Sequence, residues 1–253
     1  MLERIEHESG ICELKLNRPP VNALNPGLVH ALREAVEAAP RDDAQALVIS
    51  GSSGIFSAGL DVPTLLTLDR DRMRAFWSEF FGLCGALARS PIPVAAAITG
   101  HSPAGGAVLA LFCDYRVMAR GTYRIGLNEV QVGLTVPDCI QAGLRRLLGA
   151  YRAERLLVQG TMLDADAAFA IGFVDELADV DFVPARAIGW LGDLLKLPRQ
   201  AMLSTRALAR ADLAALFADP ASLPVDAFLD TWFAPEAQST LRAVVERLKA
   251  KKA

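Results

Sequence analysis

The sequence has few of the residues from which metal centres and disulfide frameworks are built. Its 253 residues include three histidines and four cysteines. The histidines are too few and too scattered to form a zinc site. The cysteines, at positions 12, 84, 113 and 139, form no CxxC pair, and two of them lie in apolar stretches that are typical of buried thiols. We therefore expect a reducing compartment, no disulfides and no metal.

Clustered positive charge and long apolar runs are also missing. Lysine and arginine number 26 against 29 acidic residues, a net charge of -3, whereas nucleic-acid binding needs a clustered basic face. The only basic run, Lys249, Lys251 and Lys252, is either a solvated helix end or a phosphate contact across a subunit interface. No apolar run approaches the roughly 20 residues that span a bilayer, and residues 1–6 do not resemble a secretory signal. We expect a soluble, cytoplasmic protein with no nucleic-acid or membrane partner.

Hydrophobic residues, by contrast, make up 52% of the chain, which is enough for a large core. Apolar patterning predicts strands at residues 11–16, 46–49, 94–98, 115–118 and 123–125. Helices are predicted from Asn25-Pro26 to about Ala39, over residues 70–88, and through Leu111 after a glycine pair. After Pro137 the sequence is alanine-rich and helical, apart from an extended piece at 173–176. This alternation of strands and helices, followed by a helical part, indicates the α/β class.

Residues 56–61, Phe-Ser-Ala-Gly-Leu-Asp, follow a predicted buried strand and precede a helix that begins near Pro63. Small residues let the backbone approach a ligand closely, and Gly59 can adopt torsion angles that other residues avoid. Backbone N–H groups at such a turn are free to point outward. The alternative is a plain connecting loop in which Asp61 caps the helix that follows.

Residues 103–106, Pro-Ala-Gly-Gly, lie between a buried strand and an apolar helix. A glycine-rich helix start presents unpaired N–H donors at the positive end of the helix dipole. The segment matches neither the GxxxxGK[ST] nor the GxGxxG phosphate motif, so an oxyanion is the better-fitting ligand. Two N–H donors from two loops, aimed at one thioester oxygen, would stabilise an enolate.

Residues 125–130 place a charged side chain, Glu129, among apolar and small residues directly after a predicted strand. A carboxylate in an apolar pocket has a raised pKa and can hold or release a proton. The alternative is an exposed glutamate on a loop.

Residues 100–104, Gly-His-Ser-Pro-Ala, look like the nucleophile elbow of a serine hydrolase. That fold places its histidine downstream of the serine. The histidines here are His7, His30 and His101, and none follows Ser102. The hydrolase interpretation is therefore set aside.

Three segments taken together, residues 56–61, 100–114 and 125–137, resemble the enoyl-CoA hydratase/isomerase (crotonase) superfamily in their residues, order and spacing. Residues 18–24, Arg-Pro-Pro-Val-Asn-Ala-Leu, are similar to the family's early adenine-side loop. Residues 168–176 are similar to its downstream IGLVDEV segment. The resemblance covers nearly the whole chain and weakens after about residue 180.

The resemblance implies a crotonase (ClpP-like) fold. A spiral of ββα units is expected over residues 1–195, followed by a helical trimerisation region over residues 196–253. The expected assembly is a homotrimer or a dimer of trimers. An apolar stripe in the last helix either packs on the protein's own core or forms the trimer interface; its members are Leu241, Val244, Val245 and Leu248.

The resemblance also implies an acyl-CoA thioester as substrate and no cofactor, because CoA arrives as part of the substrate. By position, Leu60 and Gly105 are expected to supply the two oxyanion N–H donors, and Glu129 is expected to move the proton. Substrate binding is expected from Val21, Ala23, Ser57, Ala58, Gly59, Asp61, Val62 and Asn128.

One position bears on the reaction. Hydratases of this family carry two acidic residues, but here the first position holds Val108, which cannot transfer a proton, and the second holds Glu129. A single carboxylate can still remove a proton from C2 and return it to C4. Mitochondrial-type Δ3,Δ2-enoyl-CoA isomerases are closely similar in residues 57–61, 103–106, 113–116 and 125–129. The resemblance thus implies an isomerase that converts 3-enoyl-CoA to trans-2-enoyl-CoA.

Two alternatives are kept. The first retains the CoA site but changes the reaction to hydration, thioester hydrolysis or decarboxylation. Asp138 would favour it if its side chain pointed inward; otherwise Asp138 caps the helix that follows. The second is a non-catalytic CoA- or RNA-binding protein on the same fold, although this acidic chain lacks the lysine-rich surface of RNA-binding relatives. Acyl specificity is left open, because Phe76, Trp77, Phe80 and Phe81 either line an acyl tunnel or belong to the core.

Overall fold

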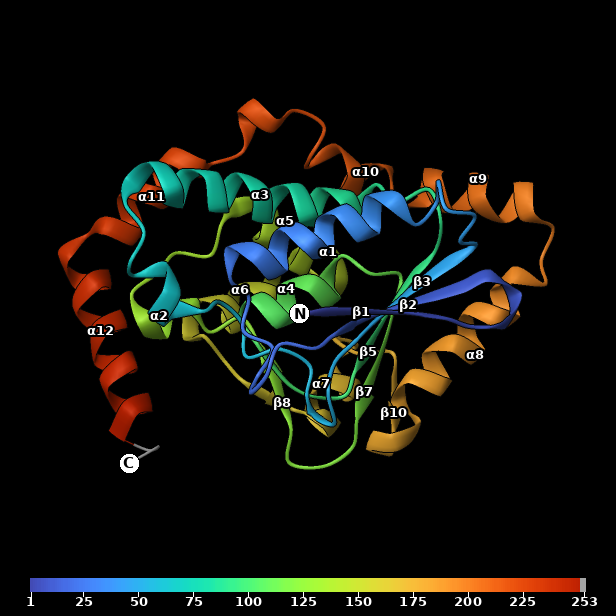
Figure 1. Cartoon of the computed structure of the whole chain (residues 1–253), viewed down its shortest axis with the longest axis horizontal. Helices are drawn as coiled ribbons and strands as arrows, with labels where there is room; N and C mark the ends of the chain where they lie inside the picture. Colours follow the sequence, from blue (N-terminus) through green and yellow to red (C-terminus); the bar gives the residue numbers. More distant parts are fainter. Residues whose placement is uncertain (251–253) are drawn as a thin grey trace.

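The computed structural model describes residues 1–250, in which helices surround two β-sheets (Figure 1). The larger sheet has the strand order β1-β2-β3-β5-β7-β10 and the smaller sheet the order β4-β6-β8-β9. The strands of the larger sheet are β1 (Leu2–Glu6), β2 (Ile11–Leu16), β3 (Ala46–Ser50), β5 (Val94–Ile98), β7 (Tyr115–Ala119) and β10 (Glu176–Ala178). Those of the smaller sheet are β4 (Gly54–Ile55), β6 (Gly100–Pro103), β8 (Arg124–Gly126) and β9 (Leu163–Asp164).

The helices confirm three predictions closely. The first begins after Asn25, whose side chain accepts a hydrogen bond from Leu28 N at 2.9 Å as an N-cap. The early helices are α1 (Pro26–Ala38), α2 (Val62–Leu65), α3 (Arg70–Ala88) and α4 (Gly105–Leu111). The later ones are α5 (Asp138–Leu148), α6 (Ala150–Gln159), α7 (Ala165–Ala170), α8 (Val183–Leu195), α9 (Arg199–Ala209), α10 (Ala211–Ala215), α11 (Val225–Phe233) and α12 (Pro235–Ala250).

Three consecutive stretches of the chain follow the same ββα path. They are β3-β4-α3, β5-β6-α4 and β7-β8-α5, and in each the first strand joins the larger sheet and the second the smaller. The units begin at Ala46, Val94 and Tyr115. Because this spacing is unequal, the repeat leaves no fixed period in the sequence. The predicted α/β spiral with a helical C-terminal part is confirmed.

Both faces of the larger sheet are covered, as parallel sheets require. Successive side chains of a strand point to opposite faces. Val48 and Ala97 therefore lie in the cluster that packs against α8, whereas Ile49 and Ala96 belong to the main core beneath α1, α3 and α4. All four are buried, which explains why these strands read as continuous apolar runs.

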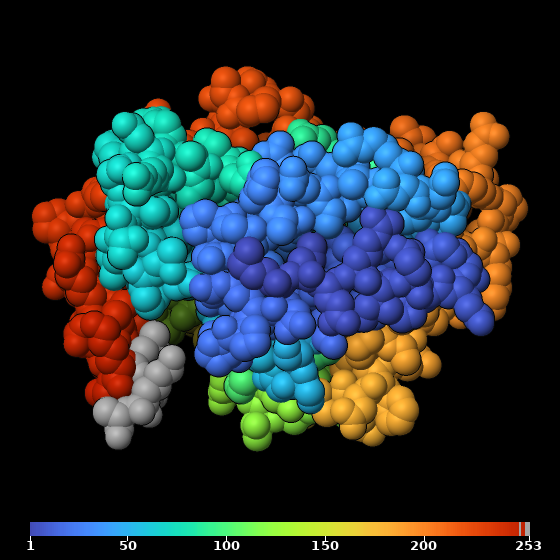
Figure 2. Space-filling view, in the orientation of Figure 1, coloured from blue at the N-terminus to red at the C-terminus, as the bar shows by residue number. Residues whose placement is uncertain are grey.

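The C-terminal helices wrap around the α3 side of the molecule. Helix α11 packs on α3, and α12 packs on α11 and α2, so that α12 forms one flank of the surface in Figure 2. Leu241 of the apolar stripe lies in the main core, Val245 is buried and Val244 is half-buried, so these positions pack within the subunit. The Leu248 side chain and residues Lys251 and Lys252 lie outside the described part.

The predicted division at residue 195 coincides with the end of α8. The main core nevertheless includes Phe228 and Trp232 of α11 together with sheet residues. The two-part division stays a prediction. None of the helices within residues 1–250 has the combination of length and apolar character that a bilayer span requires.

Four of the strands, β1, β4, β6 and β9, were not predicted from the sequence, and a further one was displaced. The sequence did not indicate β1, a largely exposed edge strand that pairs antiparallel with β2. It also did not indicate β6, which forms because Gly100 lets the backbone of Gly54 approach closely; a Cβ at Gly100 would lie 1.9 Å from the carbonyl carbon of Gly54. The extended piece at 173–176 is displaced: Phe173 and Val174 are core side chains outside any strand, and β10 covers Glu176–Ala178.

Candidate active site

The smaller sheet brings the three predicted segments together. Strands β4, β6 and β8 are parallel neighbours, with Gly54 opposite Gly100 and Ser102 opposite Ile125. The carboxyl ends of parallel strands meet at one edge of a sheet, where ligands of such sheets commonly bind. The segments that follow these strands are residues 56–61, the turn at Ala104 and the 3-10 helix η2 (Glu129–Val132).

The first of these loops is fastened to the early loop at residues 18–24. Ser57 Oγ donates to Asn22 O at 2.7 Å and accepts from Gly59 N at 3.2 Å. Ala58 N donates to Val21 O at 2.9 Å, while the Val21 side chain is exposed. Ser57 is fully buried. Its hydroxyl makes both of these hydrogen bonds within the two loops and therefore holds them in shape.

Asn22 is a positioning residue that the sequence interpretation missed. It is buried and has a φ of 51°, a left-handed conformation that asparagine tolerates better than most residues. Its Oδ1 accepts from Arg18 N at 2.8 Å, and its Nδ2 donates to Phe56 O at 3.1 Å. The signal that could have identified it is an asparagine placed directly after a Pro-Pro-Val turn.

Asp61 confirms the helix-capping interpretation. Its Oδ1 accepts from Thr64 N at 3.2 Å at the start of α2, and its Oδ2 accepts from Arg18 Nη2 at 2.6 Å. Arg18 also donates to Ala23 O at 3.0 Å. Asp61 is buried, whereas Ala23 and Val62 are half-buried. This arginine therefore ties the two loops together through a charge-assisted hydrogen bond.

The loops that carry Leu60 and Gly105 touch at two glycines. Gly59 has a φ of 80°, and a Cβ there would lie 3.2 Å from Gly105 N and 3.0 Å from Pro103 O. Only glycine permits this torsion and this approach together. Neither Leu60 N nor Gly105 N donates to an acceptor among residues 1–250. Two backbone donors without a partner among the described residues thus come from adjacent loops.

Ala104 holds Gly105 in place through a strained backbone. Its φ is 45° and its ψ is -117°, a region that residues with a side chain rarely adopt. Ala104 N donates to Gly126 O at 2.8 Å, which fixes the turn to the end of β8, three residues before Glu129. The relative position of Gly105 and Glu129 is therefore set by β6–β8 pairing.

Leu60, Gly105 and Glu129 line one cavity. Its free volume is about 20 Å³, room for roughly one water molecule. The remaining lining is apolar: Trp77, Phe80, Val108, Leu134, Pro137, Ile140 and Phe228. All four aromatic residues left open by the sequence belong to the main core, and Trp77 and Phe80 also line this cavity.

Glu129 has no charge partner in this cavity. Although the residue is half-buried as a whole, its Oε2 is shielded from solvent and has no hydrogen-bond partner among the described residues. Burial raises the pKa of Glu129 to about 7 because the charged form loses its hydration. The neighbouring Asn128 also has a buried Oδ1 without a partner in this part of the chain. The alternative of an exposed loop glutamate is wrong.

The two other positions considered for an acid do not supply one. Val108 is buried in the cavity wall. Asp138 is 81% exposed and pairs with Arg145 at 2.9 Å, so the alternative in which its side chain points inward is wrong. The capping expectation is wrong as well, because α5 begins at Asp138 itself, and its N-cap, Pro137, makes no side-chain hydrogen bond.

The serine-hydrolase arrangement is absent from the described residues. Ser102 Oγ is buried and has no hydrogen-bond partner there. The exposed His101 lies edge-on to Tyr123, and its Nδ1 accepts from Arg124 N at 3.2 Å. His101 therefore does not activate Ser102.

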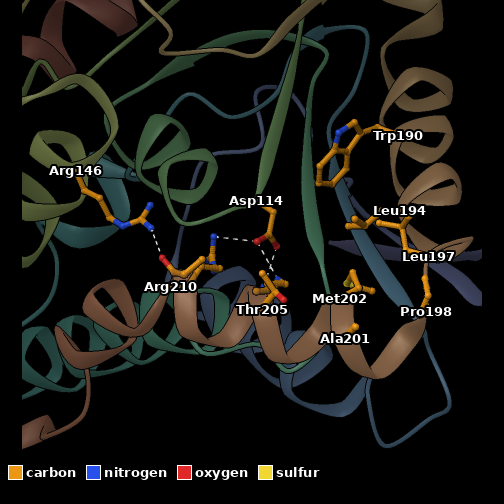
Figure 3. Close-up of a pocket in the computed structure, with 12 residues that line it drawn as sticks. Asp114, Arg146, Trp190, Leu194, Leu197, Pro198, Ala201, Met202, Thr205 and Arg210 are labelled. Carbon is orange, nitrogen blue, oxygen red and sulfur yellow. Dashed lines mark hydrogen bonds and ion pairs between the residues drawn. The ribbon is translucent and has the colours of Figure 1, made fainter.

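A second, larger cavity contains none of the predicted site residues. This groove has a volume of about 610 Å³ and lies between α8 and α9 (Figure 3). Trp190 and Leu194 face it from α8, and Met202 faces it from α9. At its floor Asp114 contacts Arg206 at 2.8 Å and Arg210 at 3.0 Å.

The sequence matches the enoyl-CoA hydratase/isomerase family over residues 6–251, and the chain belongs to this family. Its fold is that of the crotonase superfamily of enzymes. Enoyl-CoA delta isomerase 1, mitochondrial, of Homo sapiens is 30% identical over 247 residues, which are 96% of this chain and 82% of that protein.

Two further comparisons bear on the reaction. The crystal structure of human mitochondrial delta3-delta2-enoyl-CoA isomerase gives a TM-score of 0.94 at 28% identity and covers 100% of this chain and 99% of that one. A probable enoyl-CoA hydratase of Mycobacterium avium is 35% identical over 204 residues, 79% of this chain and 78% of that protein. Family membership thus establishes the enzyme class, and the site residues must distinguish isomerisation from hydration.

Proposed function

We propose that this protein is a Δ3,Δ2-enoyl-CoA isomerase, which converts 3-enoyl-CoA to trans-2-enoyl-CoA. One observation carries the proposal: Glu129 is the one ionisable side chain among the described residues that line the cavity. A double-bond shift needs one carboxylate that removes a proton and returns it. Addition of water needs a second group, and the position that resembles the hydratases' first acid holds Val108.

In the proposed reaction the thioester oxygen accepts hydrogen bonds from Leu60 N–H and Gly105 N–H. Glu129 removes a proton from C2, and the electron pair of that C–H bond moves into an enolate, which the two donors stabilise. The protonated Glu129 returns the proton to C4, and the new double bond joins C2 and C3. Because the proton is returned, the step consumes no water and needs no redox cofactor; CoA enters as part of the substrate.

The pKa of Glu129 supports both halves of this reaction. A general base works best when its pKa lies near the working pH, because it must accept the proton and then give it up. Burial places this pKa at about 7. The same carboxyl group is therefore suited to act as base at C2 and as acid at C4.

The loop residues receive different parts in the proposed substrate complex. We assign contacts with the CoA portion to Val21, Ala23, Ala58, Gly59 and Val62, and contact near the thioester to Asn128. Ser57 and Asp61 are assigned to holding the loop in shape, because their side-chain oxygens already accept or donate hydrogen bonds within the protein.

We also propose a homotrimer or a dimer of trimers. The groove between α8 and α9 has an apolar wall, and Leu197 at its edge is 51% exposed. Leu208 on α9 is 80% exposed. Apolar surface of this kind is typical of an interface. Light scattering on the wild-type protein tests the assembly, and a monomer at micromolar concentration would contradict it.

Hydration is the second candidate, supported by similarity to the mycobacterial protein named a probable hydratase. Two assays on one preparation distinguish the reactions. The first supplies a 3-enoyl-CoA and follows the conjugated 2-enoyl product. The second supplies a 2-enoyl-CoA and follows the 3-hydroxyacyl product.

We expect isomerisation without hydration, and a loss of about 10²–10⁴-fold in kcat for Glu129→Gln, the usual size of a general acid–base contribution. Hydration at a comparable rate would contradict the isomerase proposal. CoA binding without turnover of any acyl-CoA would favour the non-catalytic alternative.

A further inference from the structure

Trp77 lines the cavity of Glu129 and contains a hydrogen-bond donor without a partner among the described residues. The residue lies on α3 and is 2% exposed. Its Nε1 is shielded from solvent and has no hydrogen-bond partner among residues 1–250. An indole N–H can only donate, and buried Trp N–H groups usually have a partner. The proposed isomerase mechanism makes no use of this group.

The aromatic side chains that pack around Trp77 supply no acceptor. Its ring lies between phenylalanines, with Phe228 at a centroid distance of 4.0 Å, Phe76 at 5.4 Å and Phe80 at 5.5 Å. Another phenylalanine at this position would extend the aromatic cluster without burying an unpaired N–H. The tryptophan therefore adds one feature to the cavity, a directional donor, at a cost in stability that a purely structural residue would not carry.

This inference rests on the proposed function. Each polar group of the cavity is assigned to one part of the proposed substrate. Leu60 N–H and Gly105 N–H are assigned to the thioester oxygen, and Glu129 is assigned to C2 and C4. The Trp77 N–H is then left for the part of the acyl chain beyond the double bond. Glu129 is the one ionisable lining group among the described residues, so a carboxylate on the acyl chain would meet a like charge and no cation.

We propose that Trp77 is a specificity-determining residue whose indole N–H donates a hydrogen bond to a neutral oxygen on the acyl chain. The site then prefers one group of 3-enoyl-CoA substrates to alkyl substrates of the same length. The preferred substrates carry a hydroxyl, ether or ketone oxygen beyond the double bond. Selection follows because binding an alkyl chain leaves the buried N–H unpaired, whereas binding an oxygenated chain satisfies it.

The test compares matched pairs of substrates. Each pair consists of a 3-enoyl-CoA with a hydroxyl at one carbon beyond the double bond and its counterpart with a methyl group in place of that hydroxyl. For at least one position, wild-type kcat/KM should be about tenfold higher for the hydroxylated member, the size of one good hydrogen bond. In Trp77→Phe the ratio of kcat/KM for the hydroxylated member to that for the alkyl member should fall to about one.

Trp232→Phe is the matched control, because Trp232 is a buried tryptophan of α11 that is not part of the cavity lining. It should leave the preference unchanged. A wild-type enzyme with no preference at any position, or a preference that survives Trp77→Phe, would overturn the proposal.

A second measurement does not depend on turnover or on the folding of the variant. Saturated acyl-CoA analogues, with and without the hydroxyl, are bound to the wild-type protein while the indole N–H resonances of its three tryptophans are recorded. The Trp77 resonance should shift for the hydroxylated analogue and much less for the alkyl one. Equal shifts would count against the proposed donor role. Absence of turnover of every 3-enoyl-CoA would contradict the isomerase proposal, while this measurement would still decide the role of Trp77.

Discussion

The two cavities of this protein contain carboxylates in opposite circumstances. The groove of about 610 Å³ has Asp114 at its floor, held by Arg206 at 2.8 Å and Arg210 at 3.0 Å. The cavity of about 20 Å³ contains Glu129, which faces apolar side chains and no cation among the described residues. Both carboxylates are withdrawn from water, but only the first is neutralised.

This difference separates a paired carboxylate from the one that we propose as the general base. Asp114 pairs with two arginines, and it also accepts from Val94 N at 2.8 Å at the start of β5. Glu129 has no such partners in the described part of the chain. Burial raises its pKa to about 7, so its proton can be exchanged near neutral pH. The size of a cavity is therefore a poor guide to chemistry here, and unpaired polar atoms are a better one.

The largest expected effect on stability comes from the paired carboxylate. Asp114→Asn leaves Arg206 and Arg210 buried without a counter-charge, and breaking a buried pair in this way costs about 3–5 kcal/mol. Urea unfolding should show this loss. Turnover per folded molecule should stay within about twofold of wild type, since Asp114 does not line the small cavity. If Asp114→Asn kept its stability but lost its activity, the proposed contrast between Asp114 and Glu129 would be wrong.

Glu129→Gln should have the opposite effect on stability. In the folded protein the pKa of Glu129 is about 7, against an ordinary value of 4.5. Between these values the folded state binds more protons than the unfolded state, so this group lowers the free energy of unfolding as pH rises. The full effect is on the order of 3 kcal/mol. Glutamine does not titrate, so the variant should be more stable than wild type at pH values above 7.

Urea unfolding of both proteins from about pH 4.5 to pH 8 measures this difference. The two curves should converge at the acidic end and separate toward the alkaline end. Parallel curves would mean that Glu129 is as well solvated in the folded protein as in the unfolded chain.

Catalytic activity should depend on the same ionisation of Glu129. It should rise with pH, whereas the contribution of Glu129 to the free energy of unfolding falls. The proposed base, Glu129, would act only when ionised, so kcat/KM for a 3-enoyl-CoA should fall about tenfold per pH unit below the pKa and level off above about 7. Initial rates across this range measure the profile. A profile that is flat down to about pH 5 would contradict the proposed state of Glu129.

The smallest expected effect belongs to Asp138. Its side chain is 81% exposed and pairs with Arg145 at the surface, and such pairs contribute at most about 1 kcal/mol. Asp138→Asn should change stability by less than that and kcat by less than about twofold. A large loss of turnover would show that Asp138 takes part in catalysis despite its position.

The helices and strands with strong local patterns were predictable from the sequence. The cap at Asn25 and the alternation in β2 are signals contained in neighbouring residues. By contrast, β1 and β6 carry weak local patterns and exist because other strands pair with them. Phe173 and Val174 misled the strand prediction because their apolar character serves the core rather than a strand.

The sequence by itself determined the family, the glycine-containing loops and a lone glutamate after a strand, because each depends on residue types at fixed spacings. The tertiary structure alone decided that Phe228 of α11 closes the cavity of Glu129 and that Asp138 points away from it. It also decided that Trp77 lines this cavity and that its N–H is buried without a partner among the described residues. These facts depend on contacts between residues far apart in the chain, and on which face of a helix meets another element. No local pattern in the sequence specifies such contacts.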